Sequence, residues 1–149
     1  KWIVSSGSHL TIVNCSDETV LEYLSIYAQN ATLTMKNSSM WYLWDALFWN
    51  CNISMENVVW WYGDGIRFSN CTVTLEESLI TSFYSLRADD CAIIMEDTVI
   101  QYFWSVITTE CTLQAQDSGF FNNSIAGFAL VLFTFLGAGL LKGGFHGFF

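Results

Sequence analysis

Apolar and polar residues alternate along most of the chain, and the alternation repeats every 20 residues. Four successive repeats read CNISMENVVW, CTVTLEESLI, CAIIMEDTVI and CTLQAQDSGF, and they begin at Cys51, Cys71, Cys91 and Cys111. An alternation with a period of two predicts strands with one buried face. A fixed period of this size is typical of a solenoid, in which each repeat stacks on the next.

The repeat continues toward the N-terminus in a less regular form. The segment ATLTMKNSSM from Ala31 has Ala in the place of Cys, and TIVNCSDETV from Thr11 places Cys15 in the same column as Met55. We therefore expect the register to run from Thr11 to Phe120 without an insertion or a deletion.

Each repeat contains three apolar stretches separated by three polar positions. We expect corners at the residue before each Cys, such as Asn70, and at acidic or amide pairs such as Glu56-Asn57. A third corner is expected at Ser25, Asp45, Gly65, Ser85 and Ser105. The predicted fold is all-β: a parallel β-helix (β-solenoid) of about six 20-residue coils over residues 1–120. Helical repeats fit less well, because they need longer units and fewer β-branched and aromatic residues.

The composition changes after Asp117. Residues 118–141 carry no charge, and residues 125–141 are almost wholly apolar. The length of this apolar stretch is at the lower limit for a membrane-spanning helix. We expect residues 121–149 to form a membrane anchor and tail. Lys142 favours a cytoplasmic C-terminus, which would place the solenoid on the extracellular or lumenal side. A buried segment that caps the last coil and a cleaved lipid-anchor signal are the alternatives.

The chain is strongly acidic, with a net charge of −9 and 14 acidic against 5 basic residues. This balance argues against a nucleic-acid partner, because phosphate binding needs a basic surface. Glu56, Glu76 and Glu96 are expected to stack in one outer column, where water and salt would relieve their repulsion. Arg67 and Arg87 share another column, and we expect them to form surface ion pairs with nearby acids.

Six of the nine asparagines lie in N-x-S/T motifs, which mark exposed loops of secreted proteins. The glycosylation candidates are Asn14, Asn30, Asn37, Asn52 and Asn70, whereas Asn122 lies beside the apolar segment. Corners and outer strand faces of a solenoid also favour Asn, Ser and Thr. The repeat itself therefore raises the number of such motifs.

The cysteine column is predicted to be a ladder of small, buried free thiols. Adjacent parallel strands hold their Cβ atoms farther apart than a relaxed disulfide requires. Pairing of Cys51 with Cys71 and of Cys91 with Cys111 remains the alternative in an oxidising compartment. Stacked thiols form a line rather than a tetrahedron, so we expect no zinc site.

Aromatic residues recur at the same place in successive repeats, and the alternation requires some of them to point outward. An outward aromatic stripe is expected at Trp41, Trp44, Trp61, Tyr62, Tyr84 and Trp104. Trp60 and Phe103 are expected to point into the core. Exposed rings on a rod would form a binding surface for sugars, proteins, lipids or pigments.

The repeats NCTVTLEESLI and DCAIIMEDTVI resemble those of right-handed parallel β-helix proteins, in the pectate-lyase-like and polymorphic-membrane-protein-like superfamily. The resemblance covers residues 11–120 and lies at the level of the repeat. It implies a group that includes polysaccharide lyases and hydrolases, adhesins and structural surface proteins. The lyases use a carboxylate cluster and a cleft walled by long loops, which 20-residue coils lack, so no catalytic residue carries over.

These observations predict a non-catalytic structural or interaction protein, a membrane-anchored solenoid without catalytic residues, metal or cofactor. Its partners would be the membrane and other protein subunits or a second copy, through the aromatic stripe and the open coil end near Lys1. A carbohydrate-binding or polysaccharide-cleaving β-helix is one alternative. An accessory subunit of a large membrane complex is the other.

Overall fold

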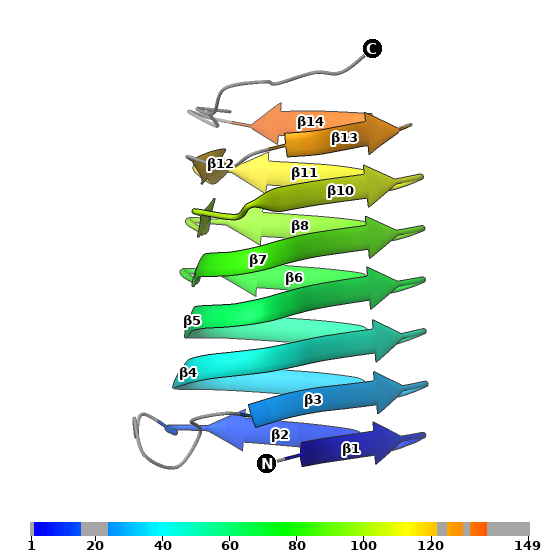
Figure 1. Ribbon diagram of the computed structural model, residues 1–149, viewed down its shortest axis with the longest axis vertical. Coiled ribbons are helices and arrows are strands. Elements are labelled where there is room, and N and C mark those ends of the chain that lie inside the picture. Colours follow the sequence, from blue (N-terminus) through cyan, green and yellow to red (C-terminus); the bar gives the residue numbers. More distant parts are fainter. Residues whose placement is uncertain (1, 16–23, 122–124, 130–131, 137–149) are drawn as a thin grey trace.

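The computed structural model describes residues 2–15, 24–121, 125–129 and 132–136 of the chain. They form one stack of coils, in which each coil lies on the one before it (Figure 1). The described strands pair in parallel, and the stack is a parallel β-solenoid of about five turns. The all-β fold and the repeat architecture expected from the sequence are confirmed.

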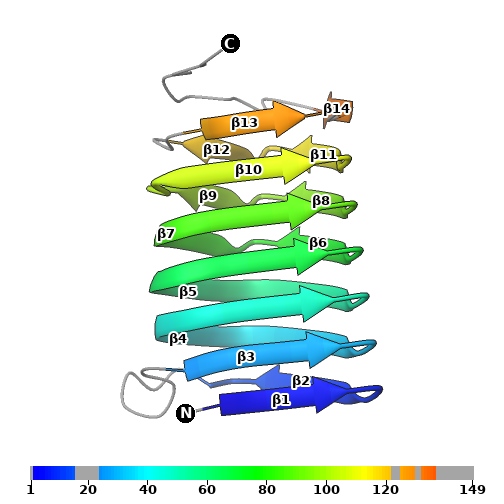
Figure 2. The same cartoon turned by 45° about the vertical axis from the view of Figure 1, so that its right-hand side comes forward.

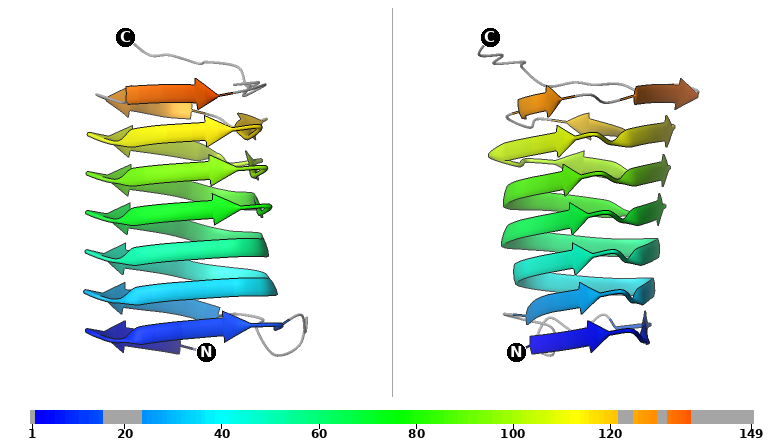
Figure 3. Two further views of the ribbon diagram at one scale, coloured as in Figure 1. Left: turned by 180° about the vertical axis from the view of Figure 1, so that it is seen from behind. Right: turned by 90° about the vertical axis from the view of Figure 1, so that its right-hand side faces the viewer.

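The strands are either short pieces or long stretches that continue around the corners of the coil. Their bounds are β1 Trp2–Ser6, β2 His9–Val13, β3 Leu24–Gln29, β4 Thr32–Trp49, β5 Asn52–Ser69, β6 Thr72–Glu76, β7 Leu79–Asp89, β8 Ala92–Glu96, β9 Val99–Gln101, β10 Ser105–Thr109, β11 Thr112–Gln116, β12 Gly119–Phe121, β13 Ile125–Ala129 and β14 Leu132–Leu136. Views from other directions show that the strands of successive coils are aligned along the stack (Figure 2 and Figure 3). Equivalent residues of successive coils therefore form straight columns.

Each complete coil of the described residues turns at three corners, and the corner residues have positive φ angles. The asparagine corner consists of Asn30, Asn50, Asn70, Asp90 and Glu110, the acidic corner of Asn37, Asn57, Glu77, Asp97 and Asp117, and the aromatic corner of Tyr42, Tyr62, Ser82 and Tyr102. Asn and Asp tolerate this conformation better than other residues with a side chain. Their tolerance explains why amides and acids recur at two of the three corners.

The third corner lies three residues before the place expected from the sequence. Asp45 and Gly65, which were expected to turn, pair with each other inside β4 and β5, and Ser85 continues the same column in β7. The corner itself is occupied by Tyr42 and Tyr62. Small and polar residues predict turns well, whereas tyrosine at a positive φ has no such local preference. The expected position was therefore wrong.

The first coil is out of step with the later ones. Most strand partners are 20 residues apart, but β2 pairs His9 with Thr32 and Ile12 with Met35. The predicted uninterrupted register from Thr11 is therefore wrong by three residues. Cys15 lies beside Ser38, whose hydroxyl oxygen accepts a hydrogen bond from the Cys15 N–H at 3.2 Å, and not in the methionine column.

The core lies inside the coils and is built from the inward members of the alternation. Trp60 and Phe103 are 0% and 2% exposed, which confirms their predicted inward orientation. Rings of neighbouring coils stack within the core, with centroids 5.4 Å apart for Phe48 and Phe68. Burial of each large apolar side chain contributes about 1.5–3 kcal/mol. The core therefore holds the columns at fixed positions on the outside.

The apolar C-terminal segment is only partly described. Its strands β13 and β14 pair in parallel with β10 and β11, and Leu113 lies opposite Phe133 in the 20-residue register. Within residues 125–141, residues 125–129 and 132–136 are these two strands and the others lie outside the described residues. The expected membrane helix stays a prediction. Among the residues that the structure describes, no helix is long and apolar enough to span a membrane.

Candidate functional site

The four cysteines stack directly after the asparagine corner. Cys51, Cys71, Cys91 and Cys111 carry free thiols and are at most 4% exposed. Each thiol donates a hydrogen bond to the carbonyl oxygen two residues before it, at 3.1–3.2 Å. The backbone N–H of Cys51 and that of Cys71 each donate to the sulfur of the next coil, at 3.5 Å. The cysteine ladder thus completes the corner by hydrogen bonding as well as by packing.

The pKa shifts alternate along the cysteine ladder. Hydrogen bonding with Cys91 lowers the pKa of the Cys71 thiol to about 6 and that of the Cys111 thiol to about 7. Burial raises the pKa of the Cys51 thiol. Hydrogen bonding to Cys111, then to Cys71, together with burial, raises the pKa of Cys91. A raised pKa keeps a cysteine in its thiol form, which is a poor nucleophile. Within the described part of the chain, no group of three or more His, Cys, Asp or Glu residues could hold a metal ion.

A column of buried hydroxyls performs the same task after the acidic corner. This hydroxyl column consists of Ser38, Ser78, Thr98 and Ser118. The Thr98 hydroxyl donates to the carbonyl oxygen of Glu96 at 2.9 Å and accepts a hydrogen bond from the N–H of Ser78 at 3.2 Å. This column was not expected from the sequence, although Ser or Thr recurs at the same place in most of the repeats.

All five glycosylation candidates are exposed, and four of them have a positive φ: Asn14, Asn30, Asn37 and Asn70, whereas Asn52 lies in β5. Side-chain amides also form ladders along the corners. The Asn70 amide donates to the Asn50 side-chain oxygen at 3.2 Å, and the Asn50 amide donates to Asn30 at 2.7 Å. Backbone conformation and these ladders explain the asparagines structurally. Glycosylation stays a prediction, and Asn122 lies outside the described residues.

The charged columns are arranged as their spacing predicts. Glu56 pairs with Glu76 in register on adjacent strands, and Lys36 forms an ion pair with Glu56 at one end of this column. In the arginine column, Arg67 and Arg87 share the carboxylate of Asp89, at 3.5 Å and 2.8 Å. The expected surface ion pairing of the two arginines is confirmed.

The aromatic corner concentrates the exposed rings of the described residues. We define the aromatic surface as Tyr42, Trp44, Tyr62, Tyr84, Tyr102 and Trp104, each of which is at least 43% exposed. Of the rings predicted to point outward, Trp41 and Trp61 are only half-buried and stack on each other with centroids 4.7 Å apart. Tyr62 of this corner was expected from the sequence to point outward, whereas Tyr42 and Tyr102 of the same column were not.

The aromatic surface consists of two neighbouring columns. One is the corner itself, in which Tyr42 and Tyr62 stack with centroids 5.8 Å apart. The other lies two residues farther along each coil and reads Trp44, Asp64, Tyr84 and Trp104. Tyr84 and Trp104 stack with centroids 6.4 Å apart. Both columns are interrupted in the middle of the stack, the first by Ser82 and the second by Asp64.

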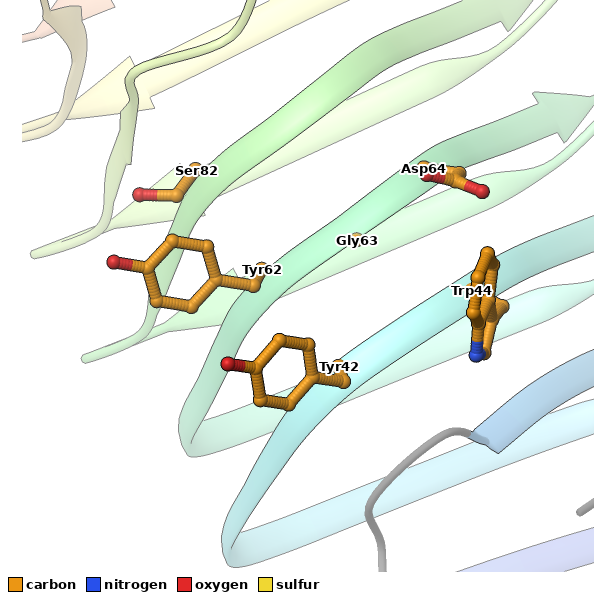
Figure 4. Close-up of a pocket in the computed structure, with 6 residues that line it drawn as sticks. All are labelled: Tyr42, Trp44, Tyr62, Gly63, Asp64 and Ser82. Atoms are coloured by element: carbon orange, nitrogen blue, oxygen red, sulfur yellow. The ribbon is translucent and has the colours of Figure 1, made fainter.

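A cleft of about 240 Å³ opens where the columns are interrupted. It is lined by Tyr42, Trp44, Tyr62, Gly63, Asp64 and Ser82. Figure 4 shows Tyr42 and Tyr62 face-on with their hydroxyls directed to the same side, away from Trp44. Trp44 is seen edge-on across Gly63 from the two tyrosines. The cleft is thus bordered by rings in two different orientations.

The glycine at the floor of the cleft is required by close packing. Gly63 occupies the column in which other coils carry Leu43, Phe83 and Phe103, all of them buried. A Cβ atom at Gly63 would overlap the carbonyl oxygen of Leu43 and the Phe83 ring. The Phe83 ring thus approaches the Gly63 backbone more closely than any residue with a Cβ would allow.

No protein-family model, curated protein or solved structure matches the chain. The likeness of the repeats to the pectate-lyase-like and polymorphic-membrane-protein-like superfamily therefore stays a resemblance. The parallel β-solenoid is the part of that resemblance that the structure shows.

Proposed function

We propose that the protein is a non-catalytic interaction protein, in which the solenoid holds the aromatic surface toward a binding partner. The observation that carries this proposal is the gathering of six exposed rings at one corner of the stack. Aromatic side chains supply large contact areas and dominate many interfaces. Exposed apolar side chains that gather on one part of a surface are typical of an interaction site.

The outward rings are poorly explained by folding. Tyr84 and Trp104 are 66% and 76% exposed, so they gain little from burial when the chain folds. Their mutual stacking adds only about 0.5–1.5 kcal/mol. The neighbouring Phe103, by contrast, is fully packed inside the coil. A partner that covers the outer rings would bury the area that folding leaves exposed.

The experiment that tests this proposal is site-specific photocrosslinking in the native host membrane or extract. Benzoylphenylalanine replaces Tyr84 in one variant and Glu96 in a control variant, because Glu96 is also exposed but lies on a different face. We expect one defined adduct from position 84 and none from position 96. Equal adducts from both positions, or none from position 84, would contradict the proposal.

Location is the second part of the proposal: the solenoid is extracellular or lumenal and is anchored through residues 125–141. Its support is the apolar composition of that segment and the exposure of all five N-x-S/T asparagines. The test is the intact mass of native material before and after glycosidase treatment. Loss of mass in sugar-sized steps supports the proposed side of the membrane, and an unmodified chain of 16.9 kDa contradicts it.

Carbohydrate binding is the second candidate function. It is favoured by the adjacent exposed rings of Tyr84 and Trp104, since flat ring faces stack on sugars. Titration with oligosaccharides, followed by the fluorescence of the seven tryptophans, separates the two candidates. Saturable quenching that is lost in Trp104→Ser would favour sugar binding.

A further inference from the structure

Among the coils from residue 43 to residue 105, the cleft lies at the coil whose residues directly after the aromatic corner depart from the repeat. Residues 63–65 read Gly-Asp-Gly, where the coils on either side read Leu-Trp-Asp and Phe-Tyr-Ser. Asp64 thereby replaces an aromatic ring of the outer column and leaves Trp44 and Tyr84 without a ring between them. A repeat that is otherwise regular here exchanges a ring for a carboxylate, and the cleft is the consequence.

The Asp64 carboxylate has no partner within the described part of the chain. It is exposed, and no hydrogen bond or ion pair is formed to it there. Arg67, the basic residue closest to it in sequence, is directed to Asp89 instead. A negative charge that lines a cleft together with three aromatic rings and lacks a cation favours a cationic ligand.

The rings around Asp64 present the electron-rich faces that attract cations. Tyr42 and Tyr62 lie on one side of Gly63 and Trp44 on the other, in different orientations (Figure 4). Trp and Tyr are the best side chains for cation–π attraction. A cation seated above Gly63 would therefore meet both the rings and the carboxylate.

The polar groups of the cleft indicate which kind of ligand fits it: a primary ammonium, a sugar or a quaternary ammonium. A primary ammonium carries three donors, and a sugar carries many hydroxyls. The cleft offers few matching groups, because the hydroxyls of Tyr42, Tyr62 and Ser82 all point away from Trp44 and Asp64 is the polar side chain on the Trp44 side. A fully methylated nitrogen needs no hydrogen bond. It is the cation that such a site satisfies best.

We propose that this cleft binds a quaternary ammonium group through Tyr42, Trp44, Tyr62 and Asp64. This inference rests on the proposed function and names the chemistry of the partner group that enters the aromatic surface. The carrier is a choline-type headgroup, because the solenoid is proposed to be anchored in a membrane. A trimethylated lysine of a protein is the alternative outcome of the test. The two sources share the same methylated cation, and the experiment below separates them.

The test uses saturation-transfer NMR and calorimetry on the whole chain, with choline and its neutral isostere 3,3-dimethylbutan-1-ol as probes. We expect choline to bind with a dissociation constant of the order of 1 mM, and the neutral isostere to bind at least about tenfold more weakly. Asp64→Asn keeps the shape and removes the charge, and Tyr62→Leu removes one ring face. Each should weaken choline binding by about five- to tenfold.

The matched control is Trp49→Leu, because Trp49 is an exposed tryptophan outside the aromatic surface. It should leave choline binding unchanged. Equal binding of the neutral isostere, or unchanged binding in Asp64→Asn, would overturn the proposal in favour of a plain apolar or sugar site. Absence of choline binding to the wild-type chain would overturn it as well.

Phosphocholine and an Nε-trimethyllysine peptide then identify the source, since the tighter ligand shows which carrier fits the cleft. Failure of this inference is distinguishable from failure of the proposed function. If no quaternary ammonium binds but the crosslink from position 84 is formed, the interaction surface stands and only the cationic ligand is wrong.

Discussion

The acidic corner and the aromatic corner turn the same coil with the same device, a residue of positive φ, yet they are completed in different ways. After the acidic corner, hydroxyls such as that of Thr98 bridge two coils by hydrogen bonds. After the aromatic corner, packing of inward rings such as Phe83 and Phe103 secures the turn, with centroids 5.5 Å apart. The outward side chains there are thus available for contacts beyond the coil.

This difference separates residues that build the rod from residues that its surface presents. Where hydrogen-bonded side chains complete a corner, substitution should change stability. Where exposed rings point outward from a corner, substitution of a ring should leave the free energy of unfolding nearly unchanged and should weaken binding of the partner. The following substitutions test this separation, from the largest expected effect on the free energy of unfolding to the smallest.

The sharpest contrast lies between two adjacent residues of the aromatic corner. Phe103→Ala should lower the free energy of unfolding by about 3–5 kcal/mol, because it leaves a cavity in the core. Trp104→Ala removes a larger ring that is mostly exposed and should change it by only about 0.5 kcal/mol. Urea unfolding of both variants checks this. Comparable losses would show that the outer rings support the fold.

The glycines of the cleft give the next contrast. Gly63→Ala should destabilise the chain by about 3 kcal/mol, because its Cβ would overlap the backbone of Leu43, which cannot move aside. Gly65→Ala is the control, since the nearest atom to its Cβ is the mobile Ser85 hydroxyl at 3.1 Å, and it should lose less than about 1 kcal/mol. Thermal unfolding of the pair measures the difference. Equal melting temperatures would refute the close packing at Gly63.

The hydroxyl column is tested at Thr98. Thr98→Val preserves the shape but leaves the Ser78 N–H and the Glu96 carbonyl without their partner, so it should lose about 1–3 kcal/mol. Thr98→Ser retains the hydroxyl and serves as the control, with a smaller loss. Urea unfolding distinguishes them. If valine were tolerated as well as serine, the hydrogen-bonded corner would have no role in stability.

The smallest expected effect is an increase in the free energy of unfolding. Val58 lies in the same column between Ser38 and Ser78 and has no hydroxyl, although it donates its own N–H to Ser78 at 3.2 Å. Val58→Thr would supply the missing bridge and should stabilise the chain by about 0.5–1 kcal/mol. A shift of the urea midpoint to a higher concentration measures it. A loss of stability would mean that the column cannot accept another hydroxyl at this coil.

Much of the architecture could be predicted because a period of 20 residues repeats the same physical constraint in every coil. Alternation alone placed Trp60 and Phe103 inside, and the spacing alone stacked Cys51 on Cys71. The register of the first coil could not be predicted, since its match to the repeat is weak and the shift of three residues follows from its pairing with β4.

The cleft could not be predicted from the sequence for a different reason. It depends on Tyr42 at a positive φ, which no local preference indicates, and on the neighbours that Gly63 meets 20 residues away on either side. The bridging role of Thr98 could not be predicted either. The sequence does not show whether the hydroxyl of a serine or threonine faces solvent or forms hydrogen bonds with the backbone.

The separation of building residues from presenting residues is tested most directly in a single variant. Trp104→Ser is combined with the photocrosslinker at position 84, and both the adduct and the urea midpoint are measured. We predict that the adduct is lost or greatly reduced, whereas the unfolding midpoint matches that of the parent with the crosslinker alone. An intact adduct together with a lowered midpoint would contradict this account, because it would make the outer rings part of the fold and not of a binding surface.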